Sequence, residues 1–399
     1  MHGISSCGRR WLSLTGLLAA VFHAVAAVGW PQEGLELDGG RVVSVKPELG
    51  LIRIEFRPPK AVQSVNLPVP FPHLTSVKIV EGFHSAPLAW QFNQDASRLS
   101  LEASSSGGGA MASSLLLEMA EKTTQFPDGR IVFSALDAVV EGSQARLETH
   151  PGNHRIGFWT RLEDSVVWNY KPTRWGRYDV EYAFSADGGD GTELEFELAG
   201  HKLRAKRPAT GSWYRYTTMS VGRVYLAKSD PFQLRVRGLN KPGVAVMNLK
   251  AVTLRPAPEG NPIRQSSNGE ILLHSRDAIT HSVLMRYEPQ TNKNCLGYWA
   301  NPKDRAQWRF QVDRGGEFDV EIWQGCGKGH GGSDVEVRSG DQALRFVVED
   351  TGHFQNWKAR SLGRIKLGVG ERDLWVNPLR KPGGAVMDIH QIILKPISP

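Results

Sequence analysis

The sequence predicts an all-β protein in which an N-terminal β-sandwich is followed by two duplicated jelly-roll β-sandwich modules. Three observations predict this. The chain matches itself at an offset of about 140 residues, over roughly 130 positions. Short runs alternate apolar and polar residues with a period of two, as in 318–322 and 232–237, which is typical of strands with one buried face. Beyond residue 27, no stretch sustains the 3.6-residue apolar period of a helix.

The first element is a leader. Arg9 and Arg10 precede an apolar stretch over 11–27, which ends with the small-residue pattern Ala24-Val25-Ala26. A short basic segment, an apolar run and such a cleavage pattern predict a signal peptide over residues 1–27. The alternative is an uncleaved anchor, but the run is shorter than the ~20 apolar residues that a membrane span needs. We therefore expect a secreted, periplasmic or cell-surface protein.

The charge of the chain argues against nucleic acid as a partner. Removing the leader lowers the formal net charge from +7 to about +5, so the mature chain is mildly basic. Its lysines and arginines are scattered through the predicted strands and are not clustered with aromatic residues, as a nucleic-acid surface would require. No later segment is apolar enough to cross a bilayer, which predicts a soluble chain without a membrane span.

The second element, residues 34–122, has no copy elsewhere in the chain. It contains alternating or apolar runs such as Gly50–Phe56 and Leu115–Met119. These runs are short and lie between turn residues. We interpret residues 34–122 as a β-sandwich domain.

The third and fourth elements are the two copies, residues 128–256 and 268–398. A Pro-rich linker over 257–267 joins them, and its prolines cannot continue a sheet. The copies stay in step apart from one inserted residue near their middle. The matches include Gly157-x-Trp159 with Gly297-x-Trp299, Trp168 with Trp308, Thr210-Gly211 with Thr351-Gly352, and Lys241-Pro242-Gly243 with Lys381-Pro382-Gly383.

The motifs of the second copy resemble a known group of modules. They are Leu296-Gly-Tyr-Trp299, Trp308–Val312, Gly316–Ile322 and Thr351-Gly-His-Phe-Gln-Asn-Trp357, in this order. The order resembles the galactose-binding-like jelly rolls of carbohydrate-binding modules. With Gln324–Gly329 included, it is more similar still to a domain appended to bacterial exported sulfatases and α-L-fucosidases.

The other two units carry this resemblance less strongly. The first copy has Asp187-Gly-Gly-Asp-Gly191 where the second has its Gly-Cys-Gly-Lys-Gly run. The N-terminal unit is faintly similar, in strand order, to the small β-domain that follows the catalytic barrel of α-L-fucosidases. The whole chain therefore resembles the C-terminal half of a fucosidase without its catalytic half.

The resemblance implies that two loops and the final Asn or Asp of each module lie near one cleft. Sugars present apolar C–H faces that stack on aromatic rings and hydroxyls that need fixed polar partners. The candidate carbohydrate-binding residues are Phe158, Trp159, Trp213, Tyr216 and Asn248 in the first copy, and Tyr298, Trp299, Phe354, Trp357 and Asp388 in the second.

Each of these aromatic residues could instead belong to a core. Trp168 and Trp308 begin alternating strands, which favours the core for both. For Trp159 and Trp299 the two interpretations are equally supported. A position on a loop favours binding for Trp213, Tyr298 and Phe354.

Nothing in the sequence indicates catalysis. A glycosidase needs two carboxylates fixed across a sugar, usually on a (β/α)₈ barrel of about 250 residues, and the chain has neither the alternation nor the room. His150 and His154 are separated by Pro151-Gly152, which breaks any helix that would align them. The run over 325–333 lacks the spacing of a phosphate-binding loop. No nucleophile elbow or H-E-x-x-H motif occurs.

We therefore expect a non-catalytic carbohydrate-binding protein that needs no cofactor. Its partner would be a polysaccharide or glycan, and the enzymes to which the similar domain is appended suggest a sulfated or fucosylated one. The metal content stays open, a structural calcium ion included. The alternatives are a structural or protein-docking scaffold at the cell surface and an accessory part of a fucosidase or sulfatase system.

Cys295 and Cys326 remain after the leader is removed, and an oxidising compartment permits a disulfide between them. The predicted fold brings Cys295, before the Leu-Gly-Tyr-Trp loop, and Cys326, after the strand 318–323, to the same side of the sandwich. The first copy has Arg155 and Ala186 at these positions, so the bridge is not essential to the fold. The alternative is a buried free thiol.

Overall fold

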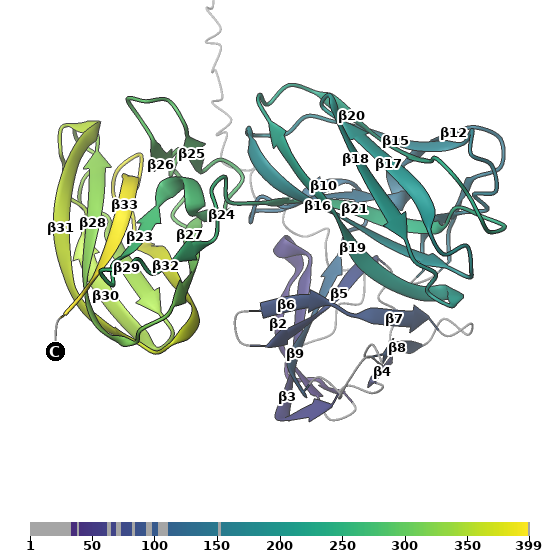
Figure 1. The fold of residues 1–399 in the computed structure, drawn as a ribbon, viewed down its shortest axis with the longest axis horizontal. Coiled ribbons are helices and arrows are strands. Elements are labelled where there is room, and N and C mark those ends of the chain that lie inside the picture. The colour runs from purple at the N-terminus through teal and green to yellow at the C-terminus, as the bar shows by residue number, and fades with distance from the viewer. Residues whose placement is uncertain are drawn as a thin grey trace, which may run out of the picture.

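The computed structural model describes residues 33–37, 40–61, 65–68, 73–81, 84–92, 98–102, 111–150 and 153–397. These residues form 33 strands and three 3₁₀ turns, η1 (Pro47–Leu49), η2 (Ala135–Asp137) and η3 (Ser275–Asp277), and none of them forms an α-helix. The all-β prediction is thus confirmed (Figure 1). The predicted signal peptide, residues 1–27, lies outside the described residues. Within the described part of the chain, no helix has the length and apolar character of a membrane span.

The N-terminal unit consists of one complete sheet and a shorter second layer. The six-stranded sheet has the order β1 (Glu36–Leu37), β2 (Gly40–Lys46), β3 (Leu51–Ala61), β9 (Met111–Met119), β5 (Leu74–Glu81), β6 (His84–Pro87). The second layer consists of β7 (Ala89–Phe92), β8 (Arg98–Glu102) and β4 (Val65–Pro68). Strand β7 also pairs with a strand of copy 1, at Gln91–Arg215 and Trp90–Tyr216. The N-terminal sandwich is therefore continuous with copy 1.

Copy 1 is a sandwich of two antiparallel sheets. One contains β10 (Thr124–Gln125), β11 (Ile131–Ser134), β21 (Asn248–Pro256), β16 (Gly176–Ala186) and β19 (Ser212–Leu226), with β13 (Arg146–Glu148) and β14 (Arg155–Gly157) beside β21. The other has the order β12 (Val139–Glu141), β15 (Ser165–Tyr170), β20 (Phe232–Gly238), β17 (Thr192–Leu198), β18 (His201–Arg207).

Copy 2 repeats this arrangement. One sheet contains β23 (Ile271–His274), β33 (Asp388–Pro396), β28 (Gly316–Cys326) and β31 (His353–Leu367), with β25 (Arg286–Glu288) and β26 (Cys295–Gly297). The other contains β22 (Ile263–Arg264), β24 (Ile279–His281), β27 (Arg305–Val312), β32 (Gly370–Arg380), β29 (Asp334–Ser339) and β30 (Gln342–Val347). Strand β22 comes from the predicted linker and pairs in parallel with β27. The linker thus contributes to the sheet as well as connecting the modules.

The two tryptophans that were predicted to be core are buried. Trp168 and Trp308 are 3% and 0% exposed, respectively, and lie in the cores of copy 1 and copy 2. Each indole N–H donates a hydrogen bond of 2.8 Å to a backbone carbonyl, that of Ser134 in copy 1 and that of His274 in copy 2. Because the acceptor lies 34 residues before the tryptophan in both copies, the repeat extends to individual hydrogen bonds.

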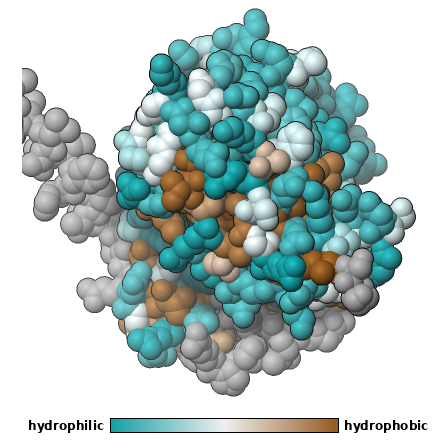
Figure 2. All heavy atoms as spheres, turned by 90° about the vertical axis from the view of Figure 1, so that its left-hand side faces the viewer, coloured by the Kyte–Doolittle hydropathy of each residue, from teal (hydrophilic) through white to brown (hydrophobic). Residues whose placement is uncertain are grey.

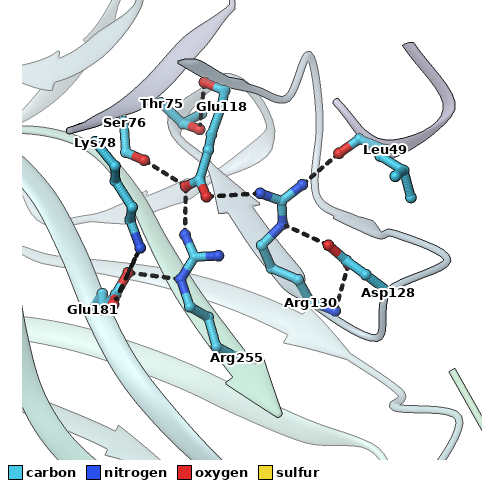
Figure 3. Close-up of polar contacts among 9 residues, drawn as sticks. All are labelled: Leu49, Thr75, Ser76, Lys78, Glu118, Asp128, Arg130, Glu181 and Arg255. Atoms are coloured by element: carbon cyan, nitrogen blue, oxygen red, sulfur yellow. Dashed lines mark hydrogen bonds and ion pairs between the residues drawn. The ribbon is translucent and has the colours of Figure 1, made fainter. Parts of the chain in front are cut away.

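Buried charges join the N-terminal unit to copy 1 (Figure 3). Glu118 of β9 is paired with Arg130 at 3.0 Å and also with Arg255 of β21. Lys78 of β5 meets Glu181 of β16 at 3.2 Å, and Glu181 pairs in turn with Arg255 at 2.8 Å. Burial alone would raise the pKa of the Glu118 carboxyl, but Arg255, Lys78 and Arg130 hold it well below its usual value. The signs alternate along the network, which compensates the cost of burying the charges.

Copy 1 and copy 2 meet through a loop that precedes β16. Arg174 of this loop donates from Nη1 to Thr280 Oγ1 at 2.6 Å and also to the Met285 carbonyl of copy 2. The next residue, Trp175, lies against the guanidinium of Arg286, with 3.6 Å between Cζ and the ring centre. These contacts fix the junction between the modules.

Candidate carbohydrate-binding site

A cavity of about 290 Å³ opens at one end of copy 1. Its walls come from β13, β14, the start of β19 and the segment that enters β21. Three of the predicted carbohydrate-binding residues, Phe158, Trp213 and Asn248, line it together. The other lining residues are Glu148, Arg155, Thr160, Tyr214, Val244 and Ala245.

The backbone presents Phe158 to solvent. Its φ of 52° lies in the left-handed region, which is rare for a residue with a side chain. Phe158 is 50% exposed, and the Arg146 guanidinium lies 3.8 Å from its ring centre. The residue before it is glycine, and a Cβ on Gly157 would come within 2.0 Å of Glu148 Oε2, so a larger residue would displace that carboxylate. The close approach brings β14 against the polar floor of the cavity.

That floor is held by hydrogen bonds. Arg155 Nε donates to Glu148 Oε2 at 2.9 Å, and Arg155 Nη1 donates to the Asn153 carbonyl at 3.2 Å. Asn248 Nδ2 donates to the Trp213 carbonyl at 2.9 Å. The guanidinium also lies 5.6 Å from the ring centre of Tyr214. The cavity thus combines aromatic walls with a carboxylate, a guanidinium and an amide in fixed positions, which is the combination that a sugar requires.

In copy 2, the equivalent of Phe158 belongs to the junction between the modules. Tyr298 has a φ of 60° and is 45% exposed. Arg286 lies between two rings, with its Cζ 3.4 Å from the centre of Tyr298 and 3.6 Å from the centre of Trp175 of copy 1. The Arg286 guanidinium therefore contacts one ring from each module. Tyr298 is one of these rings and belongs to the junction between the modules.

The remaining predicted binding residues of copy 2 contact other side chains of the same module. Asp388 Oδ2 accepts from Gln355 Nε2 at 3.1 Å and from the Cys295 thiol at 3.6 Å. Burial, followed by the nearby Glu288 carboxylate, raises the pKa of Asp388 to about 7. The ring of Phe354 lies 5.6 Å from that of His330. The two copies therefore share a backbone frame but differ in chemistry.

The structure corrects three of the predicted binding residues. Trp159 and Trp299 are 0% and 1% exposed and belong to the cores of their modules. Tyr216 is 0% exposed and stacks on Trp90 of the N-terminal unit, with ring centres 5.5 Å apart. A sugar can stack only on an accessible ring, so these three residues are structural. Trp357 is half-buried but lies on a sheet face, 5.3 Å from the ring of His390.

The predicted disulfide is also wrong in this structure, because both cysteines are free and buried. The Cys295 thiol donates to Asp388, whereas the Cys326 sulfur lies 3.9 Å from the Val386 carbonyl. Burial is the main cause that raises the pKa of both thiols, that of Cys326 to about 11. The alternative interpretation, a buried free thiol, describes both.

One group of side chains in copy 2 has the composition of a metal site. Glu288, Cys295 and Asp388 are buried, and one potential ligand atom from each lies within 4.8 Å of the others. Calcium takes six to eight oxygen ligands, and a set with one thiol and two carboxylates does not match that preference. At the equivalent positions of copy 1, Arg155 and Glu148 form an ion pair.

Sequence reasoning missed six residues that line the copy 1 cavity, namely Glu148, Arg155, Thr160, Tyr214, Val244 and Ala245. One signal pointed to the first of them, because Glu148 belongs to an Arg-x-Glu motif that both copies share. The 73% exposure of Val244 has no such signal.

No protein-family model and no curated protein matches the chain. Among solved structures, a family 35 carbohydrate binding module from Clostridium thermocellum is 14% identical over 31% of this chain and 96% of its own, with a TM-score of 0.28. The C-terminal CBM6 of LamC from Zobellia galactanivorans is 19% identical over 31% of this chain and 98% of its own, with a TM-score of 0.26. A Paenibacillus xanthan lyase is 11% identical over 87% of this chain but only 34% of its own, with a TM-score of 0.31. TM-scores this low give the similarities no weight in assigning a function.

Proposed function

We propose that this chain is an exported, non-catalytic carbohydrate-binding protein and that the cavity of copy 1 is its main sugar site. The observation that carries the proposal is the convergence of Phe158 and Trp213 with Glu148, Arg155 and Asn248 around one cavity of about 290 Å³. This volume is close to the lower end of the range for small-molecule sites, which fits one or two sugar rings. Export is inferred from the leader over residues 1–27.

The charges of the cavity favour a neutral sugar. Arg155 is paired with Glu148 at 2.9 Å, and both side chains are largely buried. The guanidinium charge is therefore already balanced, which weakens its attraction for a sulfate group. The resemblance to domains appended to sulfatases and fucosidases supports sulfated and fucosylated glycans as candidates. Of the two, the cavity fits a fucosylated glycan better.

Isothermal titration against neutral, fucosylated and sulfated oligosaccharides tests the proposal. We expect saturable binding by the full chain, loss of at least tenfold in affinity in Trp213→Ala, and no release of reducing ends from the ligand. Phe354→Ala is the matched control, because Phe354 takes the same position in copy 2 but packs against His330. A full chain that binds no member of the panel would contradict the proposal.

Equal losses in the two variants would contradict the assignment of the main site to copy 1. Expression with the leader, followed by mass determination of the exported product, tests export. Cleavage after Ala26 or Ala27 is the expected result.

A further inference from the structure

The N-terminal unit covers one sheet face of copy 1. On the outer side of β16, β19 and β21, Ala183, Tyr216 and Lys250 are 3%, 0% and 3% exposed. Tyr216 stacks on Trp90, and Lys250 Nζ donates to the Leu74 carbonyl at 3.2 Å. This face of the module is therefore an established interface within the chain.

The equivalent face of copy 2 is less buried. Trp323, Trp357 and His390 take the places of Ala183, Tyr216 and Lys250, and all three are only partly buried. His390 lies 6.2 Å from the ring of Trp323 and 5.3 Å from that of Trp357. Leu272, which replaces the buried Val132, is 47% exposed, and its cross-strand neighbour Ile393 is partly buried. We call these five residues, Leu272, Trp323, Trp357, His390 and Ile393, the copy 2 face.

Figure 2 looks onto the end of the molecule where β31 and β28 lie. Apolar side chains lie there in several groups, with hydrophilic side chains between and around them. Exposed apolar side chains rimmed by polar ones are typical of a protein interface.

The charges beside this face are self-complementary. Glu321 and Lys395 pair at 2.7 Å and are 24% and 42% exposed. They take the places of Glu181 and Arg255, which in copy 1 also meet Lys78 and Glu118 of the N-terminal unit. Copy 2 thus keeps the half of the charge network that the module itself supplies. A second copy rotated by 180° about an axis midway between Glu321 and Lys395 would place each Glu321 opposite a Lys395 and restore the alternation of signs.

Two copies could also associate by pairing of their edge strands, but the charges on the edge strand oppose this. Strand β31 is the last strand of its sheet, and it carries Lys358, Arg360, Arg364 and Lys366. Lysines and arginines on an edge strand oppose pairing with a like strand, although Glu349 and Asp319 partly offset three of these charges. Association would therefore use the face, not the edge.

We propose that two copies of this chain form a twofold-symmetric dimer through the copy 2 face, with Glu321 of each copy opposite Lys395 of the other. The N-terminal unit of each copy remains on its own copy 1. A twofold axis matches a patch with itself, which requires apolar contacts and balanced charges. The copy 2 face supplies the apolar contacts, and Glu321 and Lys395 beside it supply the balanced charges. The dimer would carry two copy 1 cavities.

Sedimentation velocity of the full chain between about 1 and 100 μM tests the proposal, since standard interfaces of micromolar affinity associate in this range. We expect a monomer that converts to a dimer with concentration. Leu272→Asp places a carboxylate on the copy 2 face beside Ile393 and should weaken the dimer at least tenfold. Trp323→Ala should also weaken it.

A charge exchange supplies the sharper test. Glu321→Lys and Lys395→Glu should each be monomeric, because like charges would meet across the axis, whereas an equimolar mixture of the two should dimerise. Glu197→Lys, on the exposed Glu197–Lys202 pair of copy 1, is the control and should dimerise as the unchanged chain does. Melting curves establish that each variant is folded.

Three results would overturn the proposal. One is a monomeric full chain throughout the concentration range. Another is a mixture of the two charge variants that stays monomeric. The third is a loss of glycan binding in Trp323→Ala, together with an unchanged chain that is monomeric in solution. The copy 2 face would then bind sugar and not a second copy. Sugar binding at the copy 1 cavity is measured separately with Trp213→Ala, so failure of the dimer leaves the proposed function intact.

Discussion

Asn248 and Asp388 begin the last strands of copy 1 and copy 2 at equivalent positions, but they have different partners. Asn248 donates to the Trp213 carbonyl at 2.9 Å. Asp388 accepts from Gln355 at 3.1 Å and from Cys295 at 3.6 Å. Cys295 also takes the place of Arg155. Copy 2 therefore has a carboxyl group where copy 1 has an amide, and a thiol where copy 1 has a guanidinium.

This difference gives copy 2 a pH dependence of its own. Burial and Glu288 raise the pKa of Asp388 to about 7 in the folded protein, whereas an unfolded aspartate has a pKa near 3.9. Between these values the folded state binds a proton that the unfolded state does not, so stability falls as the pH rises from about 4 to about 7 and then levels off. Asp388→Asn should remove this fall and stabilise the protein at pH 8, by an amount of the order of 1 kcal/mol or more.

Thermal unfolding of the unchanged chain and of Asp388→Asn, each at pH 5 and pH 8, measures the change in stability. The other titrating groups contribute equally to both chains. Asn248→Asp is the converse change in copy 1. There Arg155 lies in the same polar floor, so the new carboxylate should be tolerated better than Asp388 is. An Asp388→Asn chain with the same pH profile as the unchanged chain would show that the aspartate is ionised at neutral pH at little cost.

The exposed ring of Phe158 should be required for binding but not for folding. Its side chain is 50% exposed, so Phe158→Ala removes little buried surface and should change the free energy of unfolding by less than about 1 kcal/mol. Loss of the stacking surface should lower glycan affinity about tenfold. Titration and melting of the same preparation check both effects, and the reverse outcome would make Phe158 a structural residue.

The buried tryptophans should behave in the opposite way. Trp168→Ala and Trp308→Ala each remove a core side chain and a hydrogen bond to a backbone carbonyl. The expected cost is about 3–5 kcal/mol for each. Sugar affinity of the molecules that remain folded should be unchanged. Denaturant unfolding monitored by circular dichroism measures the cost, and a loss below about 1 kcal/mol would contradict the assignment to the core.

The repeat explains why the architecture could be predicted and the site only in part. The offset of 140 residues recurs in the bounds of β16 and β28 and of β21 and β33, because alternation along a strand is a local property that the sequence displays directly. Whether an aromatic residue is exposed depends on what packs against it. Tyr216 and Trp357 occupy equivalent positions, and only the N-terminal unit, which stacks Trp90 on Tyr216, makes one buried and the other accessible.

The prediction of a disulfide was wrong for a similar reason. The prediction that Cys295 and Cys326 lie on one side of the sandwich came from strand order. It could not include the direction of each thiol, which is set by Asp388 for one and by the surroundings of the Val386 carbonyl for the other. Of the copy 1 cavity, Phe158, Trp213 and Asn248 were predicted, whereas Glu148 and Arg155 come from strands that meet only in the fold.

The charge network under the N-terminal unit should be required for docking. Glu118→Ala would leave Arg130, 2% exposed, and Arg255 without their shared carboxylate. Removing one partner from a buried pair typically costs about 3–5 kcal/mol, and we expect an early transition in thermal unfolding as the N-terminal unit detaches from copy 1. Asp319→Ala is the control, because Asp319 pairs with Arg364 at 3.1 Å on the surface, where the loss should stay below about 1 kcal/mol. Similar losses in both variants would contradict a special role for Glu118.

The two thiols should be present but protected in the folded protein. Burial raises the pKa of Cys295 and Cys326, and only the thiolate reacts with iodoacetamide. Native protein at pH 8 should therefore gain no mass from these two residues within minutes, whereas protein unfolded in guanidinium chloride without reductant should gain two carbamidomethyl groups on them. Peptide mapping assigns the label, and Cys326→Ser serves as the one-thiol control. An unreduced chain that takes up no label at either residue after unfolding would restore the disulfide.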